Sequence, residues 1–216
     1  MKRNCITALL IIASTFSFAQ NIPVDFEASG YGASWTWTVF ENSTNPSLQI
    51  VANPDPTGLN TSSTVARFIA LQAGNPWAGC ETMHGSDIGS FSIDTSNSII
   101  RIMVWKTKIS DVGIKLVTSS AASLGEIKVA NTLINQWEQL TFDFSAHIGG
   151  LAYDQLVVFP DFVARSANDT MYFDNVFGDA AYLGDDEISR NTTTVFPNPT
   201  NGIVTVKSDS RIDLIA

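Results

Sequence analysis

The chain has 216 residues and an acidic balance, with 12 Lys and Arg against 21 Asp and Glu and a net charge of −9. This charge gives no basic patch for the phosphates of nucleic acid or for an anionic lipid surface, so we expect neither as a partner. It favours neutral ligands, or cations such as calcium.

The first 20 residues have the pattern of a signal peptide. Lys2 and Arg3 form a charged start, residues 6–12 form a short apolar run, and small residues precede a cleavage site at Ala19–Gln20. The apolar run is too short to span a membrane. Removing residues 1–20 leaves ten basic and 21 acidic residues, a net charge of −11, and Cys80 as the remaining cysteine. The mature chain is therefore expected to have no intramolecular disulfide, no thiolate metal cluster and no membrane span.

Residues 21–178 are predicted to form one all-β sandwich. Short β-rich runs alternate with turn residues about every ten positions, and no segment has helical period and length. The clearest strands are expected at Ser34–Phe40, Thr64–Leu71, Ser98–Lys106, Gly113–Val117, Glu138–Phe144, Asp154–Phe159 and Thr170–Phe177.

Residues 179–193 are read as an acidic linker, and residues 194–216 as the start of a second β unit. Two prolines and the pair Asn201-Gly202 precede the alternating residues 203–207, which predicts a β-hairpin. The sequence Val-Phe-Pro-Asn-Pro-Thr-Asn-Gly resembles the start of the C-terminal sorting domain of the type IX secretion system of Bacteroidetes.

That resemblance implies export through the periplasm to the cell surface or medium, with the type IX machinery as a partner. It covers only Val195–Ala216, and the chain stops in mid-strand by its pattern. We therefore expect a truncated sorting domain.

Five segments of the central domain together resemble jelly-roll, galactose-binding-like carbohydrate-binding modules of secreted Bacteroidetes proteins. They are Val24–Glu27, the loop Asn53–Val65, Asn75–Gly79, Trp137–Ser145 and Met171–Val176. The resemblance implies a non-catalytic, monomeric module that binds a polysaccharide.

It also implies a structural calcium held by Glu27 near the first strand and Asp174 in the last. Calcium takes about six to eight oxygen ligands, so carbonyls of the loop 58–62 would have to complete the site. In the alternative interpretation, Glu27 caps a turn and Asp174 faces solvent.

A sugar site needs exposed aromatic rings for the CH face and planar polar groups for the hydroxyls. Trp77 lies in a Pro-Trp-Ala-Gly loop, where no strand alternation directs it inward, and is the leading stacking candidate. In the run 99–106, Arg101 and Trp105 lie on the face opposite Ile100 and Ile102.

Lys115 is expected to join Arg101 and Trp105 from the next strand, which would make a concave site for a polysaccharide. The alternative is a solvated sheet face with Trp105 packed under a loop.

The remaining aromatic and imidazole side chains are assigned mainly to structure. Trp35 and Trp37 point the same way, either as paired platforms or as paired core residues, and Trp137 is expected to pack at a corner. His84 and His147 are expected to be exposed loop residues without a functional role.

The sequence has no motif of a hydrolase or lyase, neither an acidic strand of the Glu-x-Asp-x-x-Glu type nor His-Glu-x-x-His nor Gly-x-Ser-x-Gly. We therefore predict that the protein is not an enzyme. Two alternatives stay open: a calcium-stabilised adhesin or structural protein without glycan binding, and a small polysaccharide hydrolase or lyase.

Overall fold

The computed structural model describes residues 18–19, 22–178, 194–196 and 205–207. The chain divides into two units, Met1–Ala181 and Tyr182–Ala216. Most of the predicted signal peptide and the whole predicted linker lie outside the described residues.

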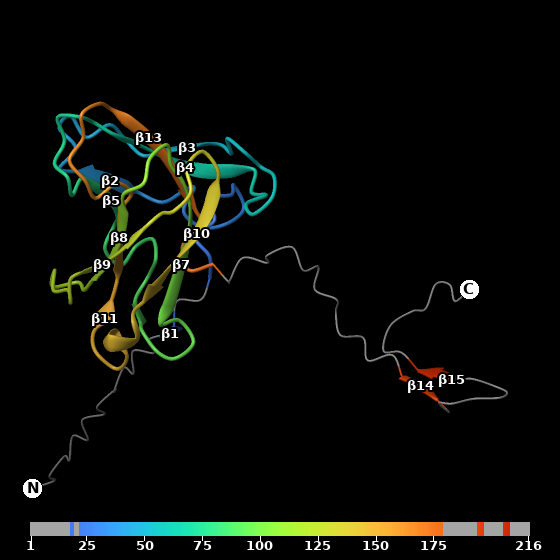
Figure 1. The fold of residues 1–216 in the computed structure, drawn as a ribbon. Coiled ribbons are helices and arrows are strands. Elements are labelled where there is room, and N and C mark those ends of the chain that lie inside the picture. Colours follow the sequence, from blue (N-terminus) through green and yellow to red (C-terminus); the bar gives the residue numbers. More distant parts are fainter. Residues whose placement is uncertain (1–17, 20–21, 179–193, 197–204, 208–216) are drawn as a thin grey trace, which may run out of the picture. The chain divides into compact units, whose positions relative to one another are not determined.

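The larger unit is a sandwich of two five-stranded sheets in which all neighbouring strands are antiparallel (Figure 1). The first sheet has the order β10-β7-β13-β4-β3 and the second the order β2-β5-β12-β8-β9.

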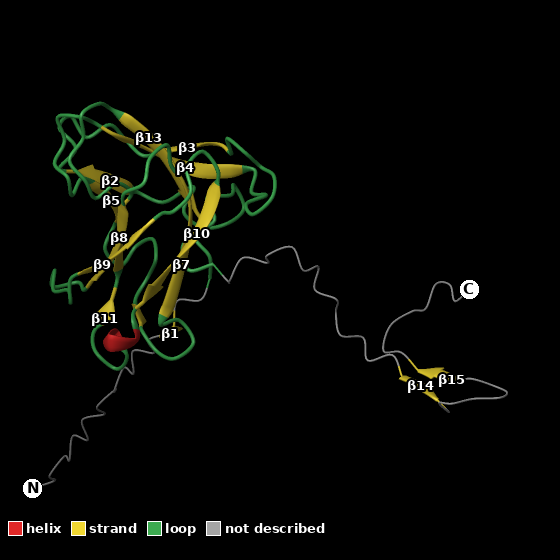
Figure 2. Ribbon diagram, in the orientation of Figure 1, coloured by secondary structure: helices red, strands yellow, loops and turns green. Residues whose placement is uncertain are grey.

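The strands of the first sheet are β3 (Gln49–Ala52), β4 (Thr64–Ala70), β7 (Ile99–Trp105), β10 (Trp137–Asp143) and β13 (Asp169–Asp174). Those of the second are β2 (Trp37–Phe40), β5 (Gly79–Thr82), β8 (Asp111–Val117), β9 (Glu126–Ala130) and β12 (Gln155–Phe159). Figure 2 shows that strands dominate this unit, and the 3-10 turn η1 (Ser145–His147) is the helical element among the described residues.

A small third sheet joins β1 (Phe18–Ala19), β6 (Phe91–Ser92) and β11 (Ala152–Tyr153). β1 falls within the segment assigned to the signal peptide. No helix in the described part of the chain is long and apolar enough to cross a membrane.

The hydrophobic core lies between the two sheets. The first sheet contributes Ile100 and Ile102, and the second contributes Ile114 and Leu116, all fully buried. Alternate residues of each strand point away from this core, because successive side chains leave opposite faces of a sheet. Lys115 therefore lies on the outer face of the second sheet, as the alternation predicts.

The all-β sandwich predicted from the sequence is confirmed, and each of the seven expected strands matches an observed one within a few residues. Strands β3, β5 and β9 were not among those seven. β5 is only four residues long and contains Cys80, Glu81 and Thr82, so its sequence carries little β pattern.

The second unit contains an antiparallel pair, β14 (Thr194–Phe196) and β15 (Thr205–Lys207), with Val195 opposite Val206. This pairing agrees with the predicted hairpin. The turn between the two strands lies outside the described residues.

Candidate functional site

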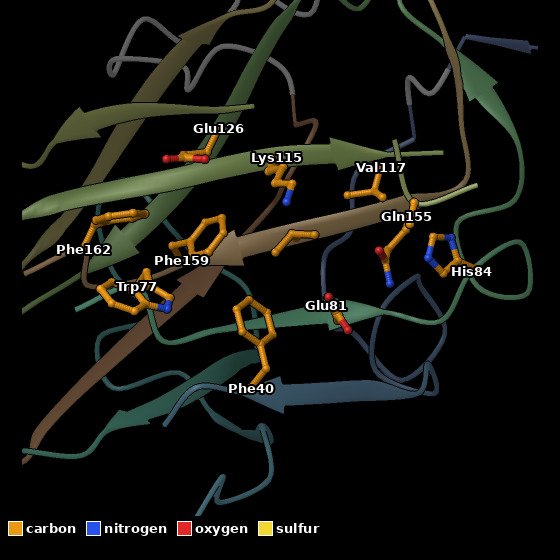
Figure 3. A pocket seen from close by; sticks show the side chains of 12 residues that line it. Phe40, Trp77, Glu81, His84, Lys115, Val117, Glu126, Gln155, Phe159 and Phe162 are labelled. Atoms are coloured by element: carbon orange, nitrogen blue, oxygen red, sulfur yellow. The ribbon is translucent and has the colours of Figure 1, made fainter. Parts of the chain in front are cut away.

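A groove lies on the outer face of the second sheet. Its volume is about 600 Å³, and all five strands of this sheet or the loops next to them contribute to it. Its lining consists of Phe40, Trp77, Glu81, His84, Lys115, Val117, Ala121, Glu126, Gln155, Val157, Phe159 and Phe162 (Figure 3).

Strand register sets a row of alternating charge across the floor of the groove. Val157 on the central strand β12 is paired with Glu81 on one side and with Lys115 on the other. Lys115 is in turn paired with Glu126 on β9. With strands about 4.8 Å apart, Lys115 lies one strand spacing from Glu126 and two from Glu81, so the row presents a donor between two acceptors.

Aromatic rings form one end of the groove. Phe40 meets Phe159 edge to face at a centroid distance of 5.7 Å, and Phe159 meets Phe162 at 5.3 Å. The Lys128 ammonium lies 4.3 Å from the Phe162 ring centroid, a cation–π distance. These contacts fix the rings as a ready-made apolar surface.

Two glycines make room for the Phe159 ring. A Cβ at Gly113 would lie 3.0 Å from Phe159 Cδ2, and one at Gly79 would lie 3.1 Å from Phe159 Cδ1 and 2.8 Å from Phe40 Cζ. Glycine at both positions therefore leaves the space that the Phe159 ring occupies.

Trp77 stands at the same end of the groove, on the loop before β5 (Figure 3). Its exposed fraction is 47%, so a large part of the indole is free to contact a ligand. The structure thus brings Trp77 and Lys115, two of the four predicted sugar-binding residues, to one groove.

The other end of the groove is polar. His84 Nδ1 lies 2.7 Å from Asp154 Oδ1, and Figure 3 shows the imidazole near Gln155. Burial raises the pKa of Glu81, an effect that His84 and then Lys115 partly oppose. His84 is exposed, as predicted, but it lines the groove.

Arg101 and Trp105 do not lie in this groove, and the expected array with Lys115 is wrong. Both belong to β7 in the first sheet, whereas Lys115 belongs to β8 in the second. β7 and β8 follow each other in the chain, but the chain crosses from one sheet to the other between them, so they are not neighbours in one sheet.

Trp105 packs on the outer face of the first sheet. Its ring meets Tyr172 edge to face at 5.5 Å, in an apolar cluster that includes Met103 and Trp137. This arrangement corresponds to the alternative in which Trp105 packs under a loop, since Leu59 of the loop before β4 belongs to the same cluster.

The remaining aromatic predictions can also be placed. The rings of Trp35 and Trp37 stack with their centroids 6.2 Å apart, and both pack against the core. Trp137 begins β10, is 5% exposed, and donates its indole N–H to Asn53 Oδ1 and Asp55 O. The expectation that His147 is exposed is wrong, because it is buried and bonds to the Tyr153 hydroxyl.

Glu27 and Asp174 hold the same loop from two sides. Glu27 Oε1 accepts the backbone N–H groups of Ser63 and Thr64, and Asp174 Oδ2 accepts from Asn60 Nδ2 at 2.9 Å. Asp174 is fully buried, not exposed as in the alternative interpretation, and burial raises its pKa to about 7.

Their carboxylate oxygens fit a hard cation such as calcium. In the loop 58–62, the carbonyls of Asn60 and Ser62 both accept from Asn53 Nδ2. The described residues contain no cluster of three or more acidic, His or Cys side chains arranged for a metal.

Sequence reasoning missed most of the groove floor. The run Leu156–Phe159 is apolar throughout, so no alternation separates Val157 and Phe159, which line the groove, from the core residues Leu156 and Val158. The sequence around Glu81 does not predict a strand, so nothing in it indicates that Glu81 lies on the groove floor.

No family model matches this sequence, and no curated protein matches it. Among solved structures, the chain is similar to an arabinose-bound GH51 α-L-arabinofuranosidase, with 13% identity and a TM-score of 0.51 over 74% of this chain and 25% of that one. The chain thus spans about a quarter of that enzyme's length.

Similar structures also include a family 29 carbohydrate-binding module, with 12% identity, a TM-score of 0.44, and coverage of 71% of this chain and 87% of that one. Another is the CBM22-1 xylan-binding domain of Xyn10C from Paenibacillus barcinonensis, with 12% identity, a TM-score of 0.43, and coverage of 77% and 100%. At such identities the likeness concerns the fold, and the chain is a β-sandwich.

Proposed function

We propose that this chain is a non-catalytic carbohydrate-binding protein and that a polysaccharide lies in the groove of the second sheet. The observation that carries the proposal is the combination of a half-exposed Trp77 and a fixed phenylalanine surface with a row of charged groups. Sugar rings present CH faces to aromatic rings and hydroxyls to planar polar groups. Both kinds of partner line this one groove.

In this proposal Trp77 provides stacking, and the half-buried rings of Phe40 and Phe162, which pack on the buried Phe159, provide apolar contact. Glu81, Lys115, Glu126 and Gln155 would bind hydroxyl groups along the floor. Arg101 and Trp105 lie on the other sheet, so we leave them out of this site.

The test is a retention assay of the full-length chain on a panel of polysaccharides: laminarin, alginate, agar, carrageenan, xylan and mannan. We expect retention on one class, which would name the ligand. Retention on none of them, by protein with the circular dichroism of a folded β-sandwich, would favour the adhesin or structural alternative.

The groove does not favour the hydrolase alternative. Glycosidases place two carboxyl groups about 5–9.5 Å apart. Glu81 and Glu126 lie on strands separated by three strand spacings, roughly 14 Å, with Val157 and Lys115 between them. Release of reducing ends or unsaturated products from the same panel would nevertheless establish an enzyme.

We also propose a structural calcium ion bound by Glu27 and Asp174. In its support, Asp174 is a fully buried carboxylate, and no ion pair to it occurs among the described residues. A buried carboxylate without a cation is costly in its charged form.

The export proposal rests on the sequence patterns alone, the predicted signal peptide at residues 1–20 and the segment similar to a type IX sorting domain at residues 194–216. In it, the protein acts at the cell surface or in the medium. Recovery of the chain from the culture medium of a host with this secretion system would test it.

A further inference from the structure

A buried guanidinium joins two segments of chain beside the groove. The Arg165 side chain is fully buried. Its Nη1 donates to the backbone carbonyls of Leu71, Gly74 and Asn75, at 3.3, 3.4 and 3.0 Å. Arg165 thus holds a turn that is about 90 residues away in sequence.

The other side of the same guanidinium is bound to Asp161. Arg165 Nε donates to Asp161 Oδ2 at 2.8 Å, and Nη2 donates to the Asp161 carbonyl at 3.1 Å. Asp161 is fully buried and also pairs with Lys108 Nζ at 3.0 Å and accepts from the Ser110 hydroxyl. Asp161 is therefore fixed from several directions.

Each of these two segments carries a ring of the groove. Trp77 follows Asn75 by two residues, and Ala78 N–H donates to the Asn75 carbonyl at 2.9 Å. Phe162 follows Asp161 directly, and its N–H donates to the Asp111 carbonyl at 2.8 Å. Figure 3 shows Trp77 and Phe162 at the same end of the groove.

We propose that Arg165 is a positioning residue of the groove, which fixes the Leu71–Asn75 turn against Asp161 and so sets where Trp77 and Phe162 stand. This inference rests on the proposed function. A buried ion pair contributes little net stability by itself. Its geometry matters here, because the planar fork of arginine reaches a carboxylate and several carbonyls at once, which the single ammonium of lysine cannot.

Holding both rings before the ligand arrives lowers the entropic cost of binding. The proposal therefore predicts that Arg165→Lys, which keeps the positive charge beside Asp161, gives a folded protein with about tenfold weaker binding of the retained polysaccharide. The emission of Trp77 alone is the spectrum of a protein minus that of the same protein carrying Trp77→Phe. In Arg165→Lys this emission should move to longer wavelength and be quenched more by acrylamide than in the wild type. Arg101→Lys on the other sheet is the matched control and should change neither quantity.

The proposal is overturned if Arg165→Lys lowers the melting temperature while affinity and Trp77 emission stay unchanged, because Arg165 would then serve stability alone. If Arg165→Lys does not fold, hydrogen exchange of the wild type decides. The amides of Gly74 and Ala78 should exchange as slowly as those of β5, and exchange at the rate of an open loop would contradict the proposal. If the wild type binds no polysaccharide, the proposed function fails, and the Trp77 emission of the variants still tests the positioning role.

Discussion

At the scale of single residues, the same side-chain type has different roles at different positions. Trp77 and Trp105 were both predicted as sugar-binding residues because both fall where strand alternation does not place them in the core. The structure leaves Trp77 half exposed in a groove and packs Trp105 against Tyr172. Alternation gives the face of a strand, but not what covers that face.

Lys106 is a buried residue with a measurable pH signature. Lys106 is 1% exposed, and burial lowers its pKa to about 8. The nearby Lys108 also lowers this pKa, whereas the carboxylates of Asp161, Asp169 and Asp111 oppose the shift. Between pH 8 and about 10.5 the folded state has released this proton and the unfolded state still holds it. Stability from this residue therefore rises with pH across that window.

We predict that the free energy of unfolding of wild type, relative to that of Lys106→Met, increases by roughly 1–2 kcal/mol from pH 8 to pH 9.5. Urea unfolding at several pH values measures it. If the free energies of unfolding of the two proteins change equally with pH, Lys106 keeps its ordinary pKa and the prediction is wrong.

At the scale of elements, the loop from Asn53 to Thr64 is where calcium would act. Glu27 and Asp174 bind this loop directly, and a cation shared by the two carboxylates would stabilise the loop further. We predict that full-length protein melts at a higher temperature in millimolar calcium than in chelator at pH 7.5, since a ligand of the folded state stabilises it by mass action.

Asp174→Asn is the matched variant, since it keeps the shape of the side chain and removes its charge. It should melt at one temperature in both buffers. Equal melting temperatures for the wild type in calcium and chelator would mean that the hydrogen bonds of Glu27 and Asp174 alone hold the loop.

Strands were predictable to the extent that they are long and apolar. The runs that became β4, β7 and β12 carry enough β-branched and aromatic residues to be recognised, whereas the four residues of β5 do not. Since β5 supplies Glu81 and follows the Trp77 loop, missing it hid half of the groove.

At the scale of the whole molecule, the sandwich follows from the sequence but the assignment of strands to sheets does not. β7 and β8 are separated by only a short turn and yet belong to opposite sheets. Such pairing depends on contacts distant in sequence, which a local pattern cannot specify. This is the reason that Arg101 was predicted beside Lys115.

The net charge of the chain also bears on its ligand. With 21 acidic and 12 basic residues, long-range electrostatics disfavour a polyanion, and Lys115 is flanked on its row by Glu126 and, one strand beyond Val157, by Glu81. Among the polysaccharides of the panel, a neutral one agrees best with this surface.

The most direct test of the account compares Trp77→Ala with Trp105→Ala for affinity to the polysaccharide that the wild type retains. Loss of a central aromatic contact costs about 2 kcal/mol or more at a binding hot spot, so Trp77→Ala should bind at least about tenfold more weakly and unfold near the wild-type temperature. Trp105→Ala should lower the melting temperature and leave the affinity unchanged. Unchanged affinity in Trp77→Ala, or its loss in Trp105→Ala, would contradict the assignment of binding to the groove of the second sheet.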